Sequence, residues 1–89
     1  MNKFDIIVST DTIYNPENYE RFYNILERYL NNPGVCFICC KKFYFGVGGG
    51  SAQFIEYINS RNYFTVEIKK EIDNSISNIR HILEIRIKK

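Results

Sequence analysis

Two side chains that can hydrogen-bond a ligand or orient a proton, Asp11 and Tyr14, stand three residues apart in a polar stretch. The stretch follows residues 4–8, a nearly continuous apolar run that is typical of a parallel strand covered on both faces. Ligands of open α/β sheets bind at the carboxyl ends of such strands. A carboxylate there can orient an amine or imidazole proton or help to hold a cationic cofactor, and a phenol can donate one hydrogen bond. The residues alone leave another interpretation open, in which Asp11 only caps backbone amides and Tyr14 only packs.

The composition predicts one small globular domain, because the 89 residues are 45% hydrophobic and 16% aromatic. Twelve basic and ten acidic side chains give a net charge of +2, which does not favour nucleic acid or an anionic membrane as the main partner. No apolar run is long enough for a membrane span, and the first residues lack the apolar core of a secretory signal. We therefore expect a cytoplasmic or nuclear protein, or one found in both compartments.

The first half of the chain predicts a strand, a helix and a second strand. Asn15 is a suitable helix cap and Pro16 a suitable first helical residue. Apolar residues then recur every three or four positions through residues 19–30, which indicates one buried helix face. Residues 31–34, Asn-Asn-Pro-Gly, are expected to end the helix, and the apolar residues 35–40 to form the next parallel strand.

The second half predicts a helix and two strands. Residues 46–50 hold four of the five glycines and are expected to form a loop, after which Ser51 can cap a helix. Apolar and polar residues alternate over residues 64–69 and again over residues 79–87. These last two strands are close in sequence with no helix between them, so they should pair antiparallel. The whole order is β-α-β-α-β-β, an α/β fold.

The three cysteines predict buried structural thiols and no metal site. Cys36, Cys39 and Cys40 lie in one predicted strand, and an odd number there is a poor disulfide framework. Their spacing could suggest metal, but His81 is the only histidine and no second cysteine pair can complete a tetrahedral site. His81 falls in the apolar phase of its strand, so we expect a hydrogen-bonded core or edge residue.

Two motifs resemble a known enzyme family. Residues 9–16, Ser-Thr-Asp-Thr-Ile-Tyr-Asn-Pro, are similar to the Asp-x-x-Tyr signature of the seven-strand, S-adenosylmethionine-dependent protein methyltransferases. Residues 44–50, Tyr-Phe-Gly-Val-Gly-Gly-Gly, and more weakly Leu83-Glu84-Ile85, resemble the histidine protein methyltransferases that modify a large-subunit ribosomal protein. The resemblance covers nearly the whole chain. It implies that residues 1–89 are one partial domain, the C-terminal half of a Rossmann-like class I methyltransferase sheet.

The resemblance also implies roles for residues. Ser9 and Thr10 would be cofactor-binding, bordering the methionine end of S-adenosylmethionine, and Asp11 and Tyr14 would be catalytic, bordering the acceptor. Four residues would be substrate-binding: Asn15, Phe45, Gly46 and Gly48. Most cofactor contacts would come from the N-terminal half, so this portion alone is expected to be inactive. The expected partner is a protein substrate, with a ribosomal protein as the one the resemblance suggests.

Other interpretations stay open. Members of the histidine-modifying branch carry Glu where this chain has Asp11, and Asp is commoner in the lysine-modifying group, so a lysine methyltransferase is an alternative. A small α/β interaction module without chemistry is another, in which the glycine stretch is only a turn. The outer edge of the first strand would be exposed, and exposed strand edges pair with other strands. The sequence therefore also predicts self-association.

Overall fold

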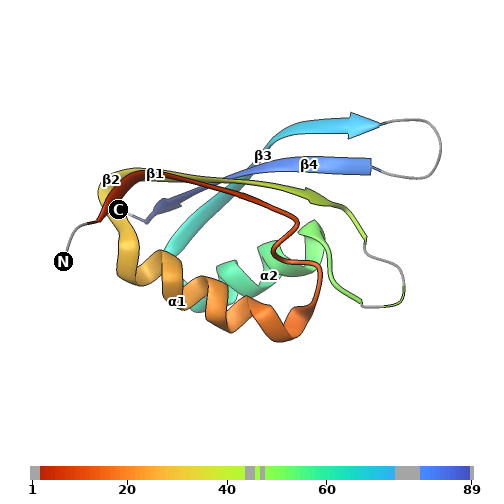
Figure 1. The fold of residues 1–89 in the computed structure, drawn as a ribbon, viewed down its shortest axis with the longest axis horizontal. Helices are drawn as coiled ribbons and strands as arrows, with labels where there is room; N and C mark the ends of the chain where they lie inside the picture. Colours follow the sequence, from red (N-terminus) through yellow and green to blue (C-terminus); the bar gives the residue numbers. More distant parts are fainter. Residues whose placement is uncertain (1–2, 44–45, 47, 74–78, 89) are drawn as a thin grey trace.

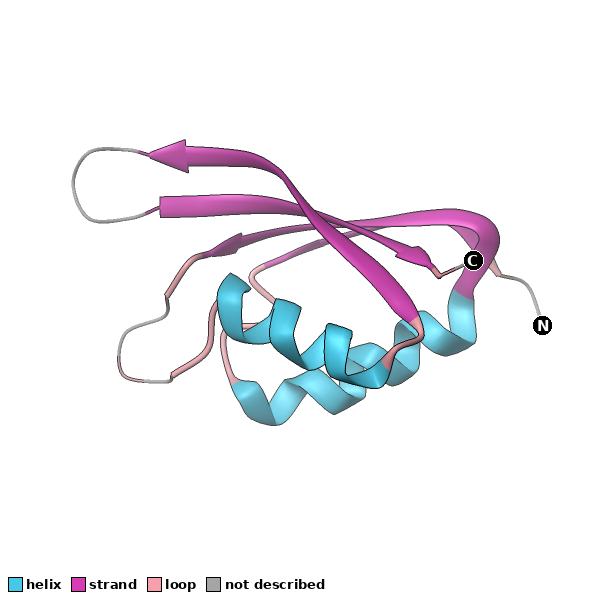
Figure 2. Ribbon diagram, turned by 180° about the vertical axis from the view of Figure 1, so that it is seen from behind, coloured by secondary structure: helices cyan, strands magenta, loops and turns pink. Residues whose placement is uncertain are grey.

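The chain forms a four-stranded sheet with two helices packed on one of its faces (Figures 1 and 2). The computed structural model describes residues 3–43, 46, 48–73 and 79–88. The elements in chain order are β1 (Phe4–Thr10), a 3-10 turn (Pro16–Asn18), α1 (Tyr19–Tyr29), β2 (Leu30–Lys41), α2 (Ser51–Arg61), β3 (Phe64–Asp73) and β4 (Ile79–Ile87). The predicted order β-α-β-α-β-β is confirmed. Neither α1 nor α2 has the length and apolar character needed to span a membrane.

The sheet is mixed, with the strand order β1-β2-β4-β3. β1 and β2 run parallel, whereas β4 lies between β2 and β3 and is antiparallel to both. The predicted antiparallel pairing of the last two strands is thus confirmed. Because of these directions, the carboxyl ends of β1 and β2 and the amino end of β4 lie at the same end of the sheet. Asp11 follows β1 at this end, and Arg80 pairs with Lys41 there.

The core fills the space between the helices and the sheet. α1 buries Tyr19, Phe22 and Leu26, so the predicted apolar face is confirmed, and α2 buries Phe54 and Ile58. The sheet contributes a layer of fully buried side chains, namely Cys36, Ile38, Cys40, Leu83 and Ile85. Paired residues such as Cys36 and Ile85 lie on the same face of neighbouring strands, which explains why this layer is continuous.

The ends of α1 differ from the sequence prediction. The Asn15 side-chain oxygen accepts a hydrogen bond from the Glu17 amide at 3.0 Å, as expected of a cap, but the first turn is a 3-10 turn. β2 begins at Leu30, so residues 31–34 do not separate the helix from the strand, and the predicted strand over residues 35–40 was too short. Leu30 pairs with Phe4 across a register irregularity. This pairing with a distant strand outweighs the local turn preference.

The prediction that the first strand is covered on both faces was wrong for this chain. Phe4, Ile6 and Val8 are 56%, 63% and 71% exposed. Ile7 packs partly against the core, so its neighbours Ile6 and Val8 point to the face of the sheet opposite the helices, which we call the outer face. The Phe4 ring lies 6.5 Å from the ring of Tyr29 at the end of α1, centroid to centroid. Neither helix lies over the outer face, so Ile6 and Val8 are left exposed (Figure 1).

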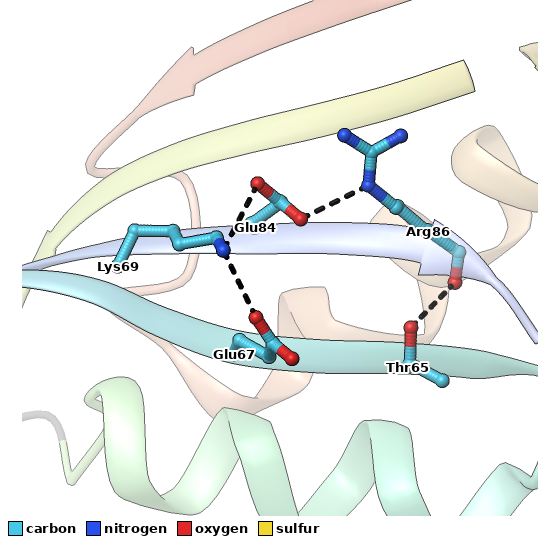
Figure 3. A network of polar contacts seen from close by, with 5 residues as sticks. All are labelled: Thr65, Glu67, Lys69, Glu84 and Arg86. Carbon is cyan, nitrogen blue, oxygen red and sulfur yellow. Dashed lines mark hydrogen bonds and ion pairs between the residues drawn. The ribbon is translucent and has the colours of Figure 1, made fainter.

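The outer face is charged where β3 and β4 form it (Figure 3). The Lys69 ammonium lies 3.1 Å from a Glu67 carboxylate oxygen and 3.7 Å from one of Glu84. The Arg86 guanidinium donates a hydrogen bond to Glu84 at 2.9 Å, and this bond is the main cause that lowers the pKa of the Glu84 carboxyl. This half of the face is therefore suited to water, unlike the half formed by β1.

All three cysteines are free thiols, but only two of them are buried. Burial raises the pKa of the Cys36 thiol to about 12 and that of the Cys40 thiol to about 12. Cys39 lies on the outer face and is half-buried, so the prediction of buried thiols was wrong for this residue. Its place in the alternation of β2 explains the difference, because Cys36 and Cys40 face the helices and Cys39 does not.

This difference predicts selective alkylation. Iodoacetamide at pH 8 should add one group to the native protein, at Cys39, because the other two thiols are shielded and protonated. In denaturant all three cysteines should react. Intact-mass spectrometry with peptide mapping checks both counts. Modification of Cys36 in the native protein at the rate of Cys39 would contradict the burial described here.

Candidate functional site

The backbone at Asp11 is in a rare conformation. Its φ angle is 55°, in the left-handed region, and its amide donates a hydrogen bond of 2.9 Å to the Cys39 carbonyl in β2. Aspartate tolerates this region better than most residues, yet single strained positions occur preferentially at functional sites. The bond to β2 therefore holds the Asp11 turn at the carboxyl end of the parallel strand pair.

The Asp11 carboxylate faces a cation from the other end of the chain. An Arg80 guanidinium nitrogen lies 3.3 Å from Asp11 Oδ1, and both side chains are partly exposed. Burial lowers the pKa of Arg80, but the Asp11 carboxylate and the Cys39 thiol together outweigh this effect and raise it. Arg80 thus stays a cation that orients the Asp11 carboxylate. Sequence reasoning did not identify Arg80, because 69 positions separate the two residues.

Asp11 and Tyr14 line the same surface pocket, which has a volume of about 320 Å³. The other lining residues are Thr12, Asn18, Arg21, Phe22 and Ile25. The polar groups come from the loop after β1 and the start of α1, and the apolar wall comes from α1. Such a pocket can hold a side chain while a carboxylate and a phenol hydrogen-bond its polar end. The structure brings the two predicted catalytic residues together; their roles stay a prediction.

The two predicted cofactor-binding residues lie beside this pocket in sequence but do not line it. The Ser9 hydroxyl donates a hydrogen bond of 2.8 Å to the Thr12 hydroxyl, which closes the loop that carries Asp11. Thr10 is the last residue of β1 and is exposed. Both residues therefore flank Asp11 on the strand side, and the bond from Ser9 helps to hold the loop in shape.

The glycine segment packs against the Asp11–Tyr14 loop, backbone on backbone. A Cβ atom placed on Gly49 would lie 2.3 Å from the Tyr14 carbonyl oxygen, which leaves room only for glycine. The Gly50 amide donates a hydrogen bond of 3.2 Å to the Tyr19 hydroxyl at the start of α1. The Asp11–Tyr14 loop and the glycine segment, more than thirty residues apart in sequence, therefore form one surface at the carboxyl ends of β1 and β2.

The predicted substrate-binding residues are placed less closely together. Gly46 and Gly48 have φ angles of 83° and 85° and no neighbour near the position of a Cβ atom, so they lie on the outside of the loop. The Asn15 side-chain oxygen already accepts the hydrogen bond from the Glu17 amide. Phe45 lies outside the described residues. Of the three that the structure describes, Asn15, Gly46 and Gly48, none lines the pocket, and the assignment of all four residues stays a prediction.

Ser51, the first residue of α2, and His81 of β4 are buried polar residues, and they form a row of hydrogen bonds with the exposed Glu71 of β3. The Ser51 hydroxyl is 2.5 Å from His81 Nδ1, and His81 Nε2 is 2.8 Å from a Glu71 carboxylate oxygen. The carboxylate can only accept, so Nε2 carries a proton, and in the neutral ring Nδ1 accepts from Ser51. The prediction that His81 is a hydrogen-bonded core residue is confirmed. The prediction that Ser51 caps α2 was wrong, since Gly50 holds the cap position and the serine hydroxyl turns to His81.

The hydrogen bond between Ser51 and His81 should contribute measurably to the stability of the folded protein. Ser51→Ala leaves His81 Nδ1 buried without its partner and is expected to lower the free energy of unfolding by about 1–3 kcal/mol. In a His81→Phe background the same change should cost almost nothing, because the partner is already absent. Urea unfolding of the four proteins measures the cycle. Ser60→Ala, at the exposed end of α2, is the control. Additive losses in the double variant would contradict the coupling.

Comparison with known proteins shows that the chain is similar in sequence to protein methyltransferases. No protein-family model matches the chain. Over 83 residues it is 37% identical to the "Histidine protein methyltransferase 1 homolog" of Dictyostelium discoideum, covering 93% of this chain and 27% of the relative. It is 34% identical over 86 residues to the protein of the same name from Bos taurus, covering 97% of this chain and 22% of the relative.

The chain is therefore homologous to the histidine protein methyltransferase 1 homologs over nearly its whole length. The protein of that name from Rattus norvegicus agrees, with 33% identity over 86 residues, 97% of this chain and 23% of the relative. The chain spans about a quarter of the length of these curated relatives. The resemblance inferred from the two motifs is thus confirmed at the level of homology to a segment of such proteins.

Proposed function

We propose that this chain is the acceptor-side portion of an S-adenosylmethionine-dependent protein methyltransferase that modifies histidine. One observation carries the proposal: Asp11 and Tyr14 share a pocket whose loop packs against Gly49, in a chain homologous to histidine protein methyltransferase 1 homologs. The pocket lies at the carboxyl end of a parallel strand, where open α/β sheets bind ligands. The topology, with an antiparallel strand between two parallel ones, agrees with the C-terminal half of a Rossmann-like methyltransferase sheet.

The pocket residues fit the acceptor side of methyl transfer. The cofactor supplies a methyl group already activated on a sulfonium, so the protein must align a nitrogen and exclude water. The Asp11 carboxylate, oriented by Arg80, accepts a hydrogen bond from the protonated nitrogen of an imidazole and leaves the other nitrogen free to attack. Tyr14 hydrogen-bonds the same acceptor, and Phe22 and Ile25 form an apolar wall that limits water.

The described residues fit only part of a cofactor site. Ser9 and Thr10 stand at the carboxyl end of β1 and offer hydroxyl groups to the methionine end. No glycine is among the pocket's lining residues, and their one acidic residue, Asp11, is the one that we assign to the acceptor. We infer that the adenosine contacts come from the part of the relatives' length that this chain does not span. The substrate would be a protein, with a ribosomal protein as the candidate that the resemblance suggests, met in the cytoplasm or the nucleus.

Calorimetric titration with S-adenosylhomocysteine tests the proposal. The 89-residue chain is compared with the longest polypeptide that its gene encodes. Binding by the longer polypeptide alone is the expected result, because the short chain lacks the adenosine contacts. Binding by neither would overturn the methyltransferase proposal and favour the non-catalytic interaction module. Transfer to lysine rather than histidine in acceptor peptides would replace the histidine assignment with the lysine alternative.

In the longer polypeptide that binds S-adenosylhomocysteine, Asp11→Asn is expected to lower the rate of methyl transfer about 100-fold or more, since the carboxylate no longer orients the acceptor nitrogen. S-adenosylhomocysteine affinity should change little, because Asp11 faces the acceptor. A radiolabelled methyl-transfer assay with parallel calorimetry separates the two effects. Glu20→Gln, which neutralises an exposed carboxylate on α1, is the control. An unchanged rate in the Asp11 variant would exclude the catalytic role.

A further inference from the structure

The Asp11 carboxylate can hold either of two acceptor side chains. It can accept a hydrogen bond from the N–H of a neutral imidazole, and it can pair with a lysine ammonium. The charge around this carboxylate therefore decides whether a cation is attracted to the pocket. A guanidinium nitrogen of Arg80 lies 3.3 Å from Asp11 Oδ1, so that charge is the sum of at least two side chains.

The sheet places Arg80 beside Asp11. Arg80 pairs in register with Lys41 of β2 and with Ile72 of β3, and residues paired in this way point to the same face of a sheet. Its neighbours across the strands are thus a cation and an apolar residue, and neither can neutralise it. The carboxylate of Asp11 supplies the opposite charge. The side chains of Arg80 and Asp11 are 29% and 41% exposed, so solvent screens this pair less than it would on an open surface.

The described side chains that line the pocket add no second negative charge. Asp11 is their one acidic residue, and Arg21 of α1 is basic. Asp11, Arg21 and Arg80 together carry two positive charges and one negative charge. An ammonium bound at Asp11 would therefore meet a net positive charge from these three residues. A neutral imidazole would meet hydrogen-bonding partners and the apolar wall without this repulsion.

We propose that Arg80 makes the pocket selective for an uncharged acceptor. The guanidinium cancels the charge of the Asp11 carboxylate, so a lysine ammonium gains no net attraction. A carboxylate has two oxygens with about four acceptor positions, so Asp11 can still accept a hydrogen bond from an imidazole N–H. Arg80 acts through Asp11 and is thus a positioning residue that determines specificity. This inference rests on the proposed function, because it takes the pocket as the site of the acceptor side chain.

Removal of the Arg80 charge should admit a cation to the pocket. Next to a partly exposed carboxylate, one unit charge changes the affinity for a second charge by about tenfold or more. In Arg80→Gln the Asp11 carboxylate loses its opposite charge, so an ammonium should bind about ten times more tightly. Arg80→Lys keeps the charge and should keep the selectivity, although lysine lacks the planar fork of arginine. A neutral ligand should respond much less to either change.

Titration of the 89-residue chain with two side-chain analogues tests the proposal. The analogues are 4-methylimidazole for histidine and n-butylamine for lysine, at pH 8.5, where an imidazole is neutral and an alkylamine is charged. Amide chemical shifts of Asp11 and Tyr14 report binding in the pocket, and circular dichroism with urea unfolding shows whether each variant is folded. We expect the original chain to bind 4-methylimidazole about tenfold more tightly than n-butylammonium, and Arg80→Gln to reduce this preference about tenfold.

Arg86→Gln is the matched control, because Arg86 also lies on β4 and also pairs with a carboxylate, that of Glu84 at 2.9 Å. It should leave both affinities unchanged. An n-butylammonium affinity that is the same in Arg80→Gln and in the original chain would overturn the proposal. The same gain in Arg80→Lys would overturn it too, because the charge would not be the cause. So would the absence of any response of the Asp11 and Tyr14 amides to 4-methylimidazole.

The role of Arg80 and the proposed function fail on different measurements. The titrations contain no cofactor, whereas the proposed function is tested by binding of S-adenosylhomocysteine to the longer polypeptide. If S-adenosylhomocysteine binds but the Arg80 charge has no effect, only the role of Arg80 is excluded. If the charge has its expected effect but S-adenosylhomocysteine does not bind, only the methyltransferase proposal is excluded.

Discussion

Gly49→Ala is expected to lower the free energy of unfolding by roughly 3 kcal/mol or more, the upper range for an overpacked site. The added Cβ would lie 2.3 Å from the Tyr14 carbonyl oxygen and 2.9 Å from that of Ile13. Both neighbours are backbone atoms, and Ile13 is fully buried, so the loop cannot yield cheaply. The two segments of the candidate site must separate or the fold must open. Urea unfolding measures the loss, and amide chemical shifts of Tyr14 and Gly49 report the separation.

Gly48→Ala is the matched control for this prediction. Gly48 has no atom within 4 Å of a Cβ position, but its φ of 85° strains any other residue. Its substitution should cost about 1–2 kcal/mol, the ordinary penalty of left-handed backbone. The Tyr14 amide should not shift. Equal losses for the two variants would mean that backbone strain, and not the contact between loops, limits this segment.

Local patterns predicted most of the fold. The three- and four-residue spacing identified the buried face of α1, and alternation identified β3 and β4. The predictions were wrong where contacts between distant segments determine the start or the burial of a strand. Leu30 joins β2 because Phe4 pairs with it, although the following residues are typical of a turn. β1 looks like a doubly covered strand, but only one of its faces meets the helices. Neither fact can be read from a window of neighbouring residues.

The candidate site was predictable only in part. Asp11 and Tyr14 stand in one motif, so their common pocket follows from a short loop. Arg80 reaches Asp11 because β4 runs antiparallel beside β2, and no spacing along the chain marks that approach. The bond between Ser51 and His81 spans 30 positions and needs the register of β4. Motifs thus identified two residues of the pocket, while the residues that pair or hydrogen-bond with the site from distant strands depend on topology.

Phe54→Ala should have the largest effect on stability, a loss of about 3–5 kcal/mol. Phe54 is fully buried on α2, and its ring lies 5.2 Å from that of Tyr19 and 6.0 Å from that of Phe22, centroid to centroid. Its removal leaves a cavity between the two helices and the sheet. Folded domains have only about 5–15 kcal/mol of stability, and a small one lies near the lower end. The variant should be largely unfolded at 37 °C by circular dichroism.

Phe43→Ala removes the same side chain from a surface position, because Phe43 is 61% exposed. It should change the free energy of unfolding by no more than about 0.5 kcal/mol. The comparison separates loss of core packing from loss of a phenyl ring as such. Tyr19 also holds the Gly50 amide, so partial unfolding of Phe54→Ala should release the glycine segment together with the helix contact. If the contact between α1 and α2 is lost but the environment of the Gly50 amide does not change, then the sheet alone, and not the helix packing, holds the candidate site in place.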